Sequence, residues 1–226
     1  LWKVLAKPLR KLKNGDFLKL SDGHVVLVRS VKNNHAVIDL QYDKSSNIES
    51  FLNLTGRMPL PPYILRNRAS DSDDDIDYQT IFASVAGSVA APTASLHFDD
   101  KILSDLKDTG IDFSYLTLHV GGGTFLPVKS ENIADHLMHS EKGHISQQTA
   151  MEINQTKRAG GRIIAVGTTS ARLLEAATSN DFCSPFDDET KIFIKPGYCF
   201  NLVDGLITNF HLPKSTLIML VAALIG

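Results

Sequence analysis

Histidine residues occur in three short motifs in the second half of the chain, each beside an apolar run. The motifs are Leu118-His119-Val120-Gly121-Gly122-Gly123-Thr124-Phe125, His136-Leu137-Met138-His139-Ser140-Glu141 and Thr208-Asn209-Phe210-His211-Leu212-Pro213. Titratable and glycine residues rarely gather at the ends of apolar runs only for packing. Histidine exchanges protons near neutral pH, and a positioned glutamate can act as an acid or base. The motifs therefore predict acid, base and ligand groups at the edge of a sheet.

A fourth motif, Gly167-Thr168-Thr169-Ser170, begins where the apolar run at residues 162–166 ends. A loop that leaves a parallel strand and opens a helix directs free backbone N–H groups at a ligand. Gly167 would let a ligand approach the backbone, and Arg172 could clamp an anion. The alternative is that the hydroxyl residues only cap the helix. The glycine spacing and the missing lysine exclude a dinucleotide fingerprint and a P-loop.

The glycine run makes a similar opening after a predicted strand, at Gly121, Gly123 and Thr124. Glycines remove side chains where another group must fit, although a tight loop without a ligand would use them too. His97 follows a stretch of small residues, which allows either the close approach of a flat ligand or simple close packing.

A metal site is a second interpretation of the motif that holds His136, His139 and Glu141. Histidines three residues apart share one helix face, but a glutamate two residues further on does not, and the His-Glu-x-x-His motif of zinc proteases is missing. A histidine and a carboxylate presented to an organic substrate fit the spacing better. His139 or Glu141 would then act as a general acid or base.

Composition and charge restrict the class of protein. A chain of 226 residues with 43% hydrophobic and 21% charged residues is typical of a globular protein with a substantial core. No apolar run reaches the length of a membrane span, and two cysteines fit a reducing compartment, which predicts the cytoplasm. The net charge is −2, but the first thirty residues hold seven basic and two acidic side chains, a distribution that can bind a polyanion or be only a solvated face.

Two domains are expected, with a boundary near Arg57. Short alternating runs joined by turn residues predict a small β-barrel or meander over residues 1–57. Three prolines and an aspartate-rich stretch through Asp77 predict a loop or mobile linker next. Predicted strands at 111–120, 162–166, 191–194 and 202–208 alternate with predicted helices at 99–109, 146–159 and 170–178. This order predicts an α/β domain with a largely parallel sheet over residues 58–226.

Several of these motifs resemble one family, the S-adenosylmethionine:tRNA ribosyltransferase-isomerases of queuosine biosynthesis. The matching motifs run across essentially the whole chain: Met58-Pro59-Leu60-Pro61-Pro62-Tyr63-Ile64, Tyr78-Gln79-Thr80, Ala90-Ala91-Pro92-Thr93-Ala94, Leu96-His97-Phe98, Thr117-Leu118-His119-Val120-Gly121, Gly123-Thr124-Phe125, Met138-His139-Ser140-Glu141, Val166-Gly167-Thr168-Thr169-Ser170 with Arg172, Pro196-Gly197-Tyr198 and Thr208-Asn209-Phe210-His211-Leu212-Pro213. Ser95 and Gly122 depart from the family pattern, which has glycine and alanine there.

The resemblance implies an α/β catalytic domain with a small inserted β-barrel, and a family sequence that extends before Leu1 and beyond Gly226. It implies transfer and isomerisation of the ribosyl part of S-adenosylmethionine onto 7-aminomethyl-7-deazaguanine at the tRNA wobble position. Epoxyqueuosine in tRNA is formed, and adenine and methionine are released. No metal or other cofactor is expected, and a monomer is expected. A metal-dependent hydrolase and a non-catalytic RNA-binding module are the alternatives.

This chemistry needs bases, acids and substrate-holding groups, which we assign to three sets of residues. The predicted acid–base residues are His97, His119, His139, Glu141 and His211. The predicted substrate-binding residues are Gly121, Gly123, Thr124, Gly167, Thr168, Thr169, Arg172 and Asn209. The predicted contacts to the tRNA backbone are Lys7, Arg10, Lys11 and Lys13.

Overall fold

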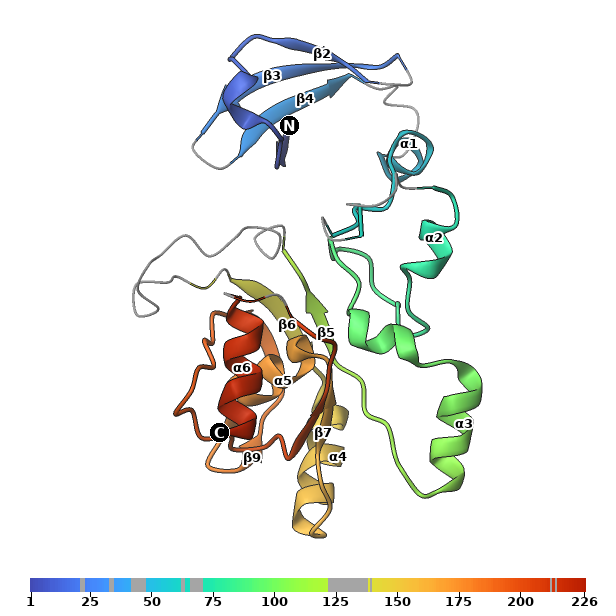
Figure 1. Cartoon of the computed structure of the whole chain (residues 1–226), viewed down its shortest axis with the longest axis vertical. Coiled ribbons are helices and arrows are strands. Elements are labelled where there is room, and N and C mark those ends of the chain that lie inside the picture. Colours follow the sequence, from blue (N-terminus) through green and yellow to red (C-terminus); the bar gives the residue numbers. More distant parts are fainter. Residues whose placement is uncertain are drawn as a thin grey trace. The chain divides into compact units, whose positions relative to one another are not determined.

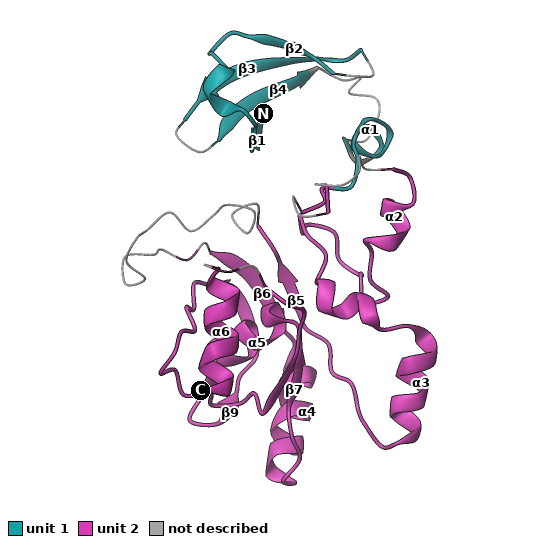
Figure 2. Cartoon of the chain, in the orientation of Figure 1, with its two compact units in different colours: residues 1–58 teal, residues 59–226 magenta. Residues whose placement is uncertain are grey.

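The computed structural model describes residues 1–20, 23–32, 35–41, 48–61, 64–65, 71–121, 138, 140–211, 213 and 215–226. The chain forms two compact units, Leu1–Met58 and Pro59–Gly226 (Figures 1 and 2). The expected boundary near Arg57 lies one residue before this division. The functional identities of the two domains stay predictions.

Unit 1 is built on a four-stranded antiparallel sheet with the order β1-β4-β3-β2. Its elements are β1 (Trp2–Val4), η1 (Leu9–Lys11), β2 (Phe17–Lys19), β3 (Val25–Val31), β4 (Ala36–Gln41) and α1 (Ile48–Thr55). Val26 and Val28, at alternate positions of β3, and Ala36 of β4 are almost fully buried and form the core of this unit. β2 and β3 form an antiparallel hairpin in which Phe17 lies opposite Leu27, as expected for a barrel or meander of short strands. Closure of the sheet into a barrel is not confirmed by the described strands, which end the sheet at β1 and β2.

Unit 2 holds the remaining elements in an alternation of helices and short strands. They are α2 (Asp74–Asp77), η2 (Thr93–His97), α3 (Asp100–Asp108), β5 (Thr117–His119), β6 (Glu141–Ile145), α4 (Gln147–Arg158), β7 (Ile164–Val166), α5 (Thr168–Ala176), β8 (Thr178–Ser179), β9 (Phe182–Cys183), β10 (Phe186–Thr190), β11 (Gly205–Ile207) and α6 (Thr216–Ile225).

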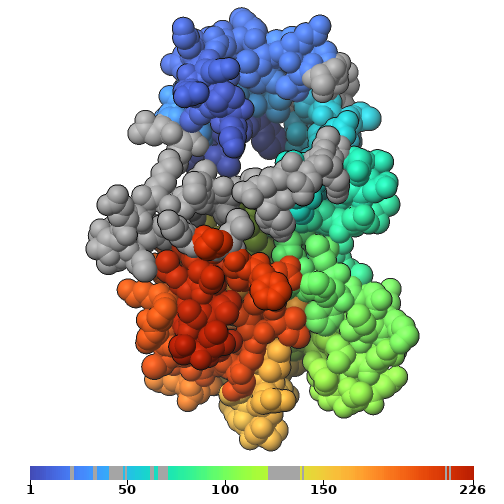
Figure 3. All heavy atoms as spheres, viewed as in Figure 1, coloured from blue at the N-terminus to red at the C-terminus, as the bar shows by residue number. Residues whose placement is uncertain are grey.

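Side-chain caps begin two of the predicted helices. The Asp99 carboxylate accepts a hydrogen bond from the Ile102 backbone N–H (2.7 Å), which begins α3. The Ser146 hydroxyl accepts one from the Thr149 backbone N–H (3.0 Å), which begins α4. α3 has no buried residue, and its atoms are part of the green surface in Figure 3.

The prediction of a largely parallel sheet is wrong for the described strands of unit 2. Only β7 and β11 pair in parallel, whereas β5, β6 and β10 form an antiparallel sheet in the order β10-β6-β5. The apolar run at 191–194, which was predicted as a strand, comes directly after β10 and is not a strand in the structure. The strand itself is the acidic segment Phe186–Thr190, which runs antiparallel to β6 with Thr190 opposite Glu141. An exposed edge strand tolerates such charge.

The aspartate-rich stretch also differs from the prediction of a loop or mobile linker. It contains the short helix α2, and Asp74 within it is buried. The Asp74 carboxylate accepts a hydrogen bond from the Asp71 backbone N–H (2.9 Å). The local hydrogen bonds of aspartate side chains therefore organise this stretch.

The core of unit 2 lies around α5, which packs against β5, β7 and β8. Buried residues of α4, α5, β6 and β7 form one cluster that includes Ile145, Ile153, Ala165 and Leu173. Gly143 allows the contact between β6 and α5, because a Cβ there would lie 2.5 Å from Leu173 Cδ1. In the part of the chain that the structure describes, every helix is too short or too polar to cross a membrane.

Candidate active site

The carboxyl ends of β7 and β11 lie side by side and form the centre of the candidate site. Their parallel pairing sets Val166 opposite Ile207. The Gly167 backbone N–H extends the ladder by donating to the Ile207 carbonyl (2.8 Å). Gly167 and Thr168 therefore lie beside Thr208 and Asn209, although 40 residues separate the two segments in sequence. The predicted strand–loop–helix unit is confirmed, with α5 starting at Thr168.

Gly167 has a positive φ of 90°, a conformation that favours glycine. It caps α5 without a side-chain hydrogen bond, so the alternative in which a hydroxyl residue caps this helix is not observed. A Cβ on Gly167 would lie 3.9 Å from the Ala94 Cβ, which places η2 next to this loop. The stretch of small residues before His97 thus packs closely against the start of α5.

His97 and Asn209 are in direct contact, although they are 112 residues apart in sequence. The distance between His97 Nε2 and Asn209 Oδ1 is 2.8 Å, and the contact is solvent-exposed. His211, two residues further on, is partly buried, and its Nε2 lies 3.1 Å from the Thr208 hydroxyl. Burial lowers the pKa of His211, which favours a neutral ring at pH 7.

Glu141 of β6 and Arg172 of α5 form a buried ion pair. The Arg172 Nη1 donates to Glu141 Oε2, and its Nε donates to the Ile192 carbonyl (3.3 Å). Both side chains are 8% exposed. Arg172 Nη2 is buried without a hydrogen-bond partner among the described atoms. In the structure, Glu141 and Arg172 are therefore ionic partners of each other. The predicted acid–base role of Glu141 and the predicted substrate contact of Arg172 stay predictions.

His119, at the end of β5, lies against a backbone segment that the sequence motifs did not single out. Gly87 has a φ of 136°, and a Cβ there would lie 2.8 Å from His119 Nδ1. The neighbouring Ser88 hydroxyl accepts a hydrogen bond from the Val120 backbone N–H (3.1 Å). Residues 87–89 thus fix the position of the His119 ring, and an isolated glycine was the only sequence signal of this contact.

Several predicted residues lie outside the described residues: Gly123 and Thr124 of the substrate-binding set, and His136 and His139 of the histidine motif. Gly121 is described and partly buried. The metal alternative with His136, His139 and Glu141 is therefore not tested by geometry. Among the described residues, no group of three His, Cys, Asp or Glu side chains is placed to bind a metal ion.

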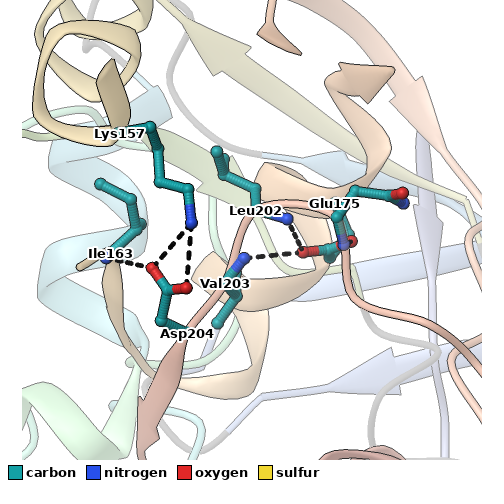
Figure 4. A network of polar contacts seen from close by, with 7 residues as sticks. Lys157, Ile163, Glu175, Leu202, Val203 and Asp204 are labelled. Carbon is teal, nitrogen blue, oxygen red and sulfur yellow. Dashed lines mark hydrogen bonds and ion pairs between the residues drawn. The ribbon is translucent and has the colours of Figure 1, made fainter. Parts of the chain in front are cut away.

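Two carboxylates, Glu175 and Asp204, fix the backbone segment that leads into β11. The sequence motifs did not identify either of them. Glu175 of α5 accepts hydrogen bonds from the Leu202 and Val203 backbone N–H groups, each at 3.0 Å. Asp204 accepts one from the Ile163 backbone N–H (2.7 Å) and pairs with Lys157 (2.9 Å) (Figure 4). Burial raises the pKa of Asp204, but the hydrogen bonds from Ile163 and Lys157, together with the positive charges of Lys157 and Arg162, outweigh burial and leave that pKa lowered. The network sets where β11 starts, and so where Thr208 and Asn209 follow.

The predicted tRNA contacts are all exposed and lie in unit 1, around η1. Lys7, Arg10, Lys11 and Lys13 occupy the connection between β1 and β2. This placement is compatible with contact to a phosphate backbone.

Unit 2 is a domain of helices and short strands in which one parallel pair, β7 and β11, presents polar side chains at its carboxyl ends. Residues 1–226 match the model of a family described as queuosine biosynthesis protein. The chain therefore belongs to the queuosine biosynthesis protein family.

Relatives named S-adenosylmethionine:tRNA ribosyltransferase-isomerase match the chain over its full length. The protein of Ruegeria pomeroyi is 50% identical over 225 residues, and that of Zymomonas mobilis is 51% identical over 227 residues. The chain spans 64% and 66% of their lengths. A crystal structure of S-adenosylmethionine tRNA ribosyltransferase from Thermotoga maritima is 26% identical with a TM-score of 0.48, and the match covers 100% of this chain and 60% of that one. The resemblance inferred from sequence motifs is confirmed, and the hydrolase and RNA-binding alternatives find no support among these relatives.

Proposed function

We propose that this protein transfers and isomerises the ribosyl moiety of S-adenosylmethionine onto 7-aminomethyl-7-deazaguanine at the wobble position of tRNA. The products would be epoxyqueuosine in tRNA, adenine and methionine. The observation that carries the proposal is the match of about half of all residues, along the whole chain, to relatives named for ribosyl transfer from S-adenosylmethionine to tRNA.

The reaction makes three chemical demands on the protein. The sulfonium acidifies the neighbouring ribose carbon, so a base must remove a proton there. Adenine must leave, so a hydrogen-bond donor or acid is needed at its ring. The amine of the deazaguanine must be neutral to attack. A neutral histidine meets the first demand, and a positioned hydroxyl or amide meets the second.

The group of residues at the ends of β7 and β11 fits these demands best. His97 is exposed to a substrate, and the lowered pKa of His211 keeps its ring neutral and able to accept a proton near pH 7. Thr168 and Thr169 would supply neutral donors and acceptors for the ribose and adenine edges. The start of α5 lies at the same place, and its free backbone N–H groups suit the methionine carboxylate.

The wobble base lies in a single-stranded loop of tRNA, from which a base can be turned out into a pocket. We propose that Lys7, Arg10, Lys11 and Lys13 contact the tRNA backbone. Reversing the charge of Lys11 and Lys13 should weaken tRNA binding and reduce its salt dependence by a slope of about 2, because each phosphate contact contributes about one unit. Unchanged binding would place the tRNA surface elsewhere.

We further propose that the enzyme is a cytoplasmic monomer and uses no metal or cofactor beyond its two substrates. Dialysis against a chelator should then leave the rate of adenine release unchanged.

The direct test of the function is adenine release from S-adenosylmethionine, measured with and without tRNA that carries the aminomethyl deazaguanine. The proposal predicts release only with the modified tRNA. Binding of tRNA without release of adenine would support the RNA-binding alternative and refute the proposed reaction.

A further inference from the structure

We propose that Asn209 is a positioning residue that holds His97 in a single tautomer, with the proton on Nε2 and the free lone pair on Nδ1. In the proposed reaction, His97 Nδ1 would then be the atom that removes the ribose proton. The first statement concerns the folded protein alone, and the second rests on the proposed function.

The tautomer follows from the chemistry of the contact. The atom of Asn209 that lies 2.8 Å from His97 Nε2 is the amide oxygen Oδ1. A carbonyl oxygen only accepts hydrogen bonds, so Nε2 must donate and carry the hydrogen. In a neutral ring the other nitrogen, Nδ1, then has the lone pair. The contact is also compatible with the protonated ring, because Nε2 carries a hydrogen in both states.

Both partners are held by the backbone around them. Asn209 comes two residues after β11, whose last residue, Ile207, pairs with Val166 of β7. His97 ends η2, where the Phe98 backbone N–H donates to the Ser95 carbonyl (3.2 Å). The Phe98 ring also packs against Phe82, with ring centres 5.9 Å apart. The pair therefore joins two ordered segments, so the ring has little freedom to turn.

His211 provides a contrast within the same site. Its Nε2 lies 3.1 Å from the Thr208 hydroxyl. A hydroxyl both donates and accepts, so it tolerates either tautomer of the ring. Of these two histidines, only His97 has a partner that selects a tautomer, and His97 is also the more exposed to a substrate. This combination of a fixed tautomer and an open ring suits a general base.

The proton transfer is balanced within the proposed reaction. The C–H bond next to the sulfonium breaks, its electron pair stays on the carbon, and the proton forms a bond to Nδ1. The ring becomes an imidazolium, which keeps its Nε2–H hydrogen bond to Asn209. Return of the proton to a later intermediate restores the neutral ring. Asn209 does not exchange a proton at any step.

The tautomer can be tested without any activity, by ¹⁵N NMR of the histidine rings in the ¹⁵N-labelled protein above pH 8. His97→Gln identifies the signals of His97. We expect an Nε2–H signal and an unprotonated Nδ1 signal in the wild type, and Asn209→Ala should shift both toward values averaged between tautomers. Thr208→Ala, the matched control, should change the signals of His211 and leave those of His97 unchanged. A protonated Nδ1 in the wild type, or signals insensitive to Asn209→Ala, would overturn the proposal.

The catalytic consequence is tested by the rate of adenine release. Asn209→Ala should lower kcat about 10- to 100-fold with little change in KM for S-adenosylmethionine, as expected when a base loses its orientation. Asn209→Asp keeps an acceptor for Nε2–H and should recover most of the rate. A higher KM with unchanged kcat would instead make Asn209 a substrate-binding group and refute its role in positioning the base. If the wild type releases no adenine but shows the expected tautomer, the proposed function fails and the assignment of the tautomer stands.

Discussion

The buried carboxylate of Glu175 allows a quantitative test of how the site is held in place. Its two oxygens accept four hydrogen bonds, all between 2.9 and 3.0 Å. The donors are the Tyr198 hydroxyl and the backbone N–H groups of Asn201, Leu202 and Val203. Glu175 is only 3% exposed, so water cannot replace these bonds without unfolding this part of the protein. We predict that Glu175→Gln destabilises unit 2.

The size of the effect follows from the partners. A glutamine keeps one oxygen, which can still accept from the buried Leu202 and Val203 N–H groups. Each of these bonds loses its ionic character and weakens by about 1 kcal/mol. The amide nitrogen then faces Asn201 N–H, which loses its acceptor at a further cost of about 1 kcal/mol. The loss in the free energy of unfolding is therefore about 3 kcal/mol. Glu175→Ala leaves two buried N–H groups unpaired, and we expect it to cost about 5 kcal/mol.

Urea unfolding followed by circular dichroism measures this loss. With a slope of about 2 kcal/mol per molar urea, Glu175→Gln should lower the midpoint by about 1.5 M. Trp2 is the single tryptophan and lies in β1, so its fluorescence follows unit 1 separately and should not shift. Glu189→Gln is the control, because Glu189 is exposed and its change should stay within about 0.5 kcal/mol. A Glu175→Gln protein as stable as the wild type would refute the argument.

Three further predictions concern other parts of unit 2. Gly87→Ala should destabilise the protein by about 1–3 kcal/mol, because φ is positive there and the new Cβ would meet the His119 ring; an unchanged His119 NMR signal would contradict this contact. Burial, and then the Glu175 carboxylate, raises the pKa of Tyr198 to about 12. Its contribution to stability should thus be complete below pH 10 and be lost as the pH rises toward 12, a loss that Tyr198→Phe removes in unfolding experiments between pH 9 and 12. The lowered pKa of His211 has the opposite effect. Its contribution to stability should be complete above about pH 6.5 and be lost as the pH falls below that value, and His211→Gln should reduce this loss. If the stability of His211→Gln fell with decreasing pH as that of the wild type does, His211 would be excluded as the source of this pH dependence.

Local signals in the sequence predicted those elements whose cause is itself local. The predicted helices at 99–109 and 146–159 and the strand–loop–helix unit at Gly167 depend on residues within a few positions of each other, and each is present in the structure. The histidine motif near residue 209 could be placed at a strand end for the same reason.

The antiparallel sheet of unit 2 could not be predicted because its strands lack an apolar face. In β6 the inward positions are Glu141, Gly143 and Ile145, so only one of the three is hydrophobic. Glu141 is buried because Arg172, 31 residues away in sequence, pairs with it. Gly143 is buried because Leu173 fills the space that a side chain at position 143 would occupy. Such contacts depend on the tertiary fold, and no spacing within either motif indicates them.

The contact between His97 and Asn209 was also beyond the sequence motifs, although both residues were candidates. Asn209 was assigned to substrate binding by residue type, whereas the structure gives its Oδ1 a partner in His97. The pairing of β11 with β7 decides this, since it places the segment after Ile207 next to the loop at Gly167. Residue type thus identified members of the site, and topology decided which of them touch.

The central claim, that the ends of β7 and β11 carry out ribosyl transfer, is tested most directly by single-turnover adenine release with modified tRNA and S-adenosylmethionine. His97→Gln should slow this release at least about 100-fold at saturating substrates, as expected for loss of a general base. His24→Gln, a histidine in unit 1, should match the wild type. Adenine release by His97→Gln at the wild-type rate would contradict the account.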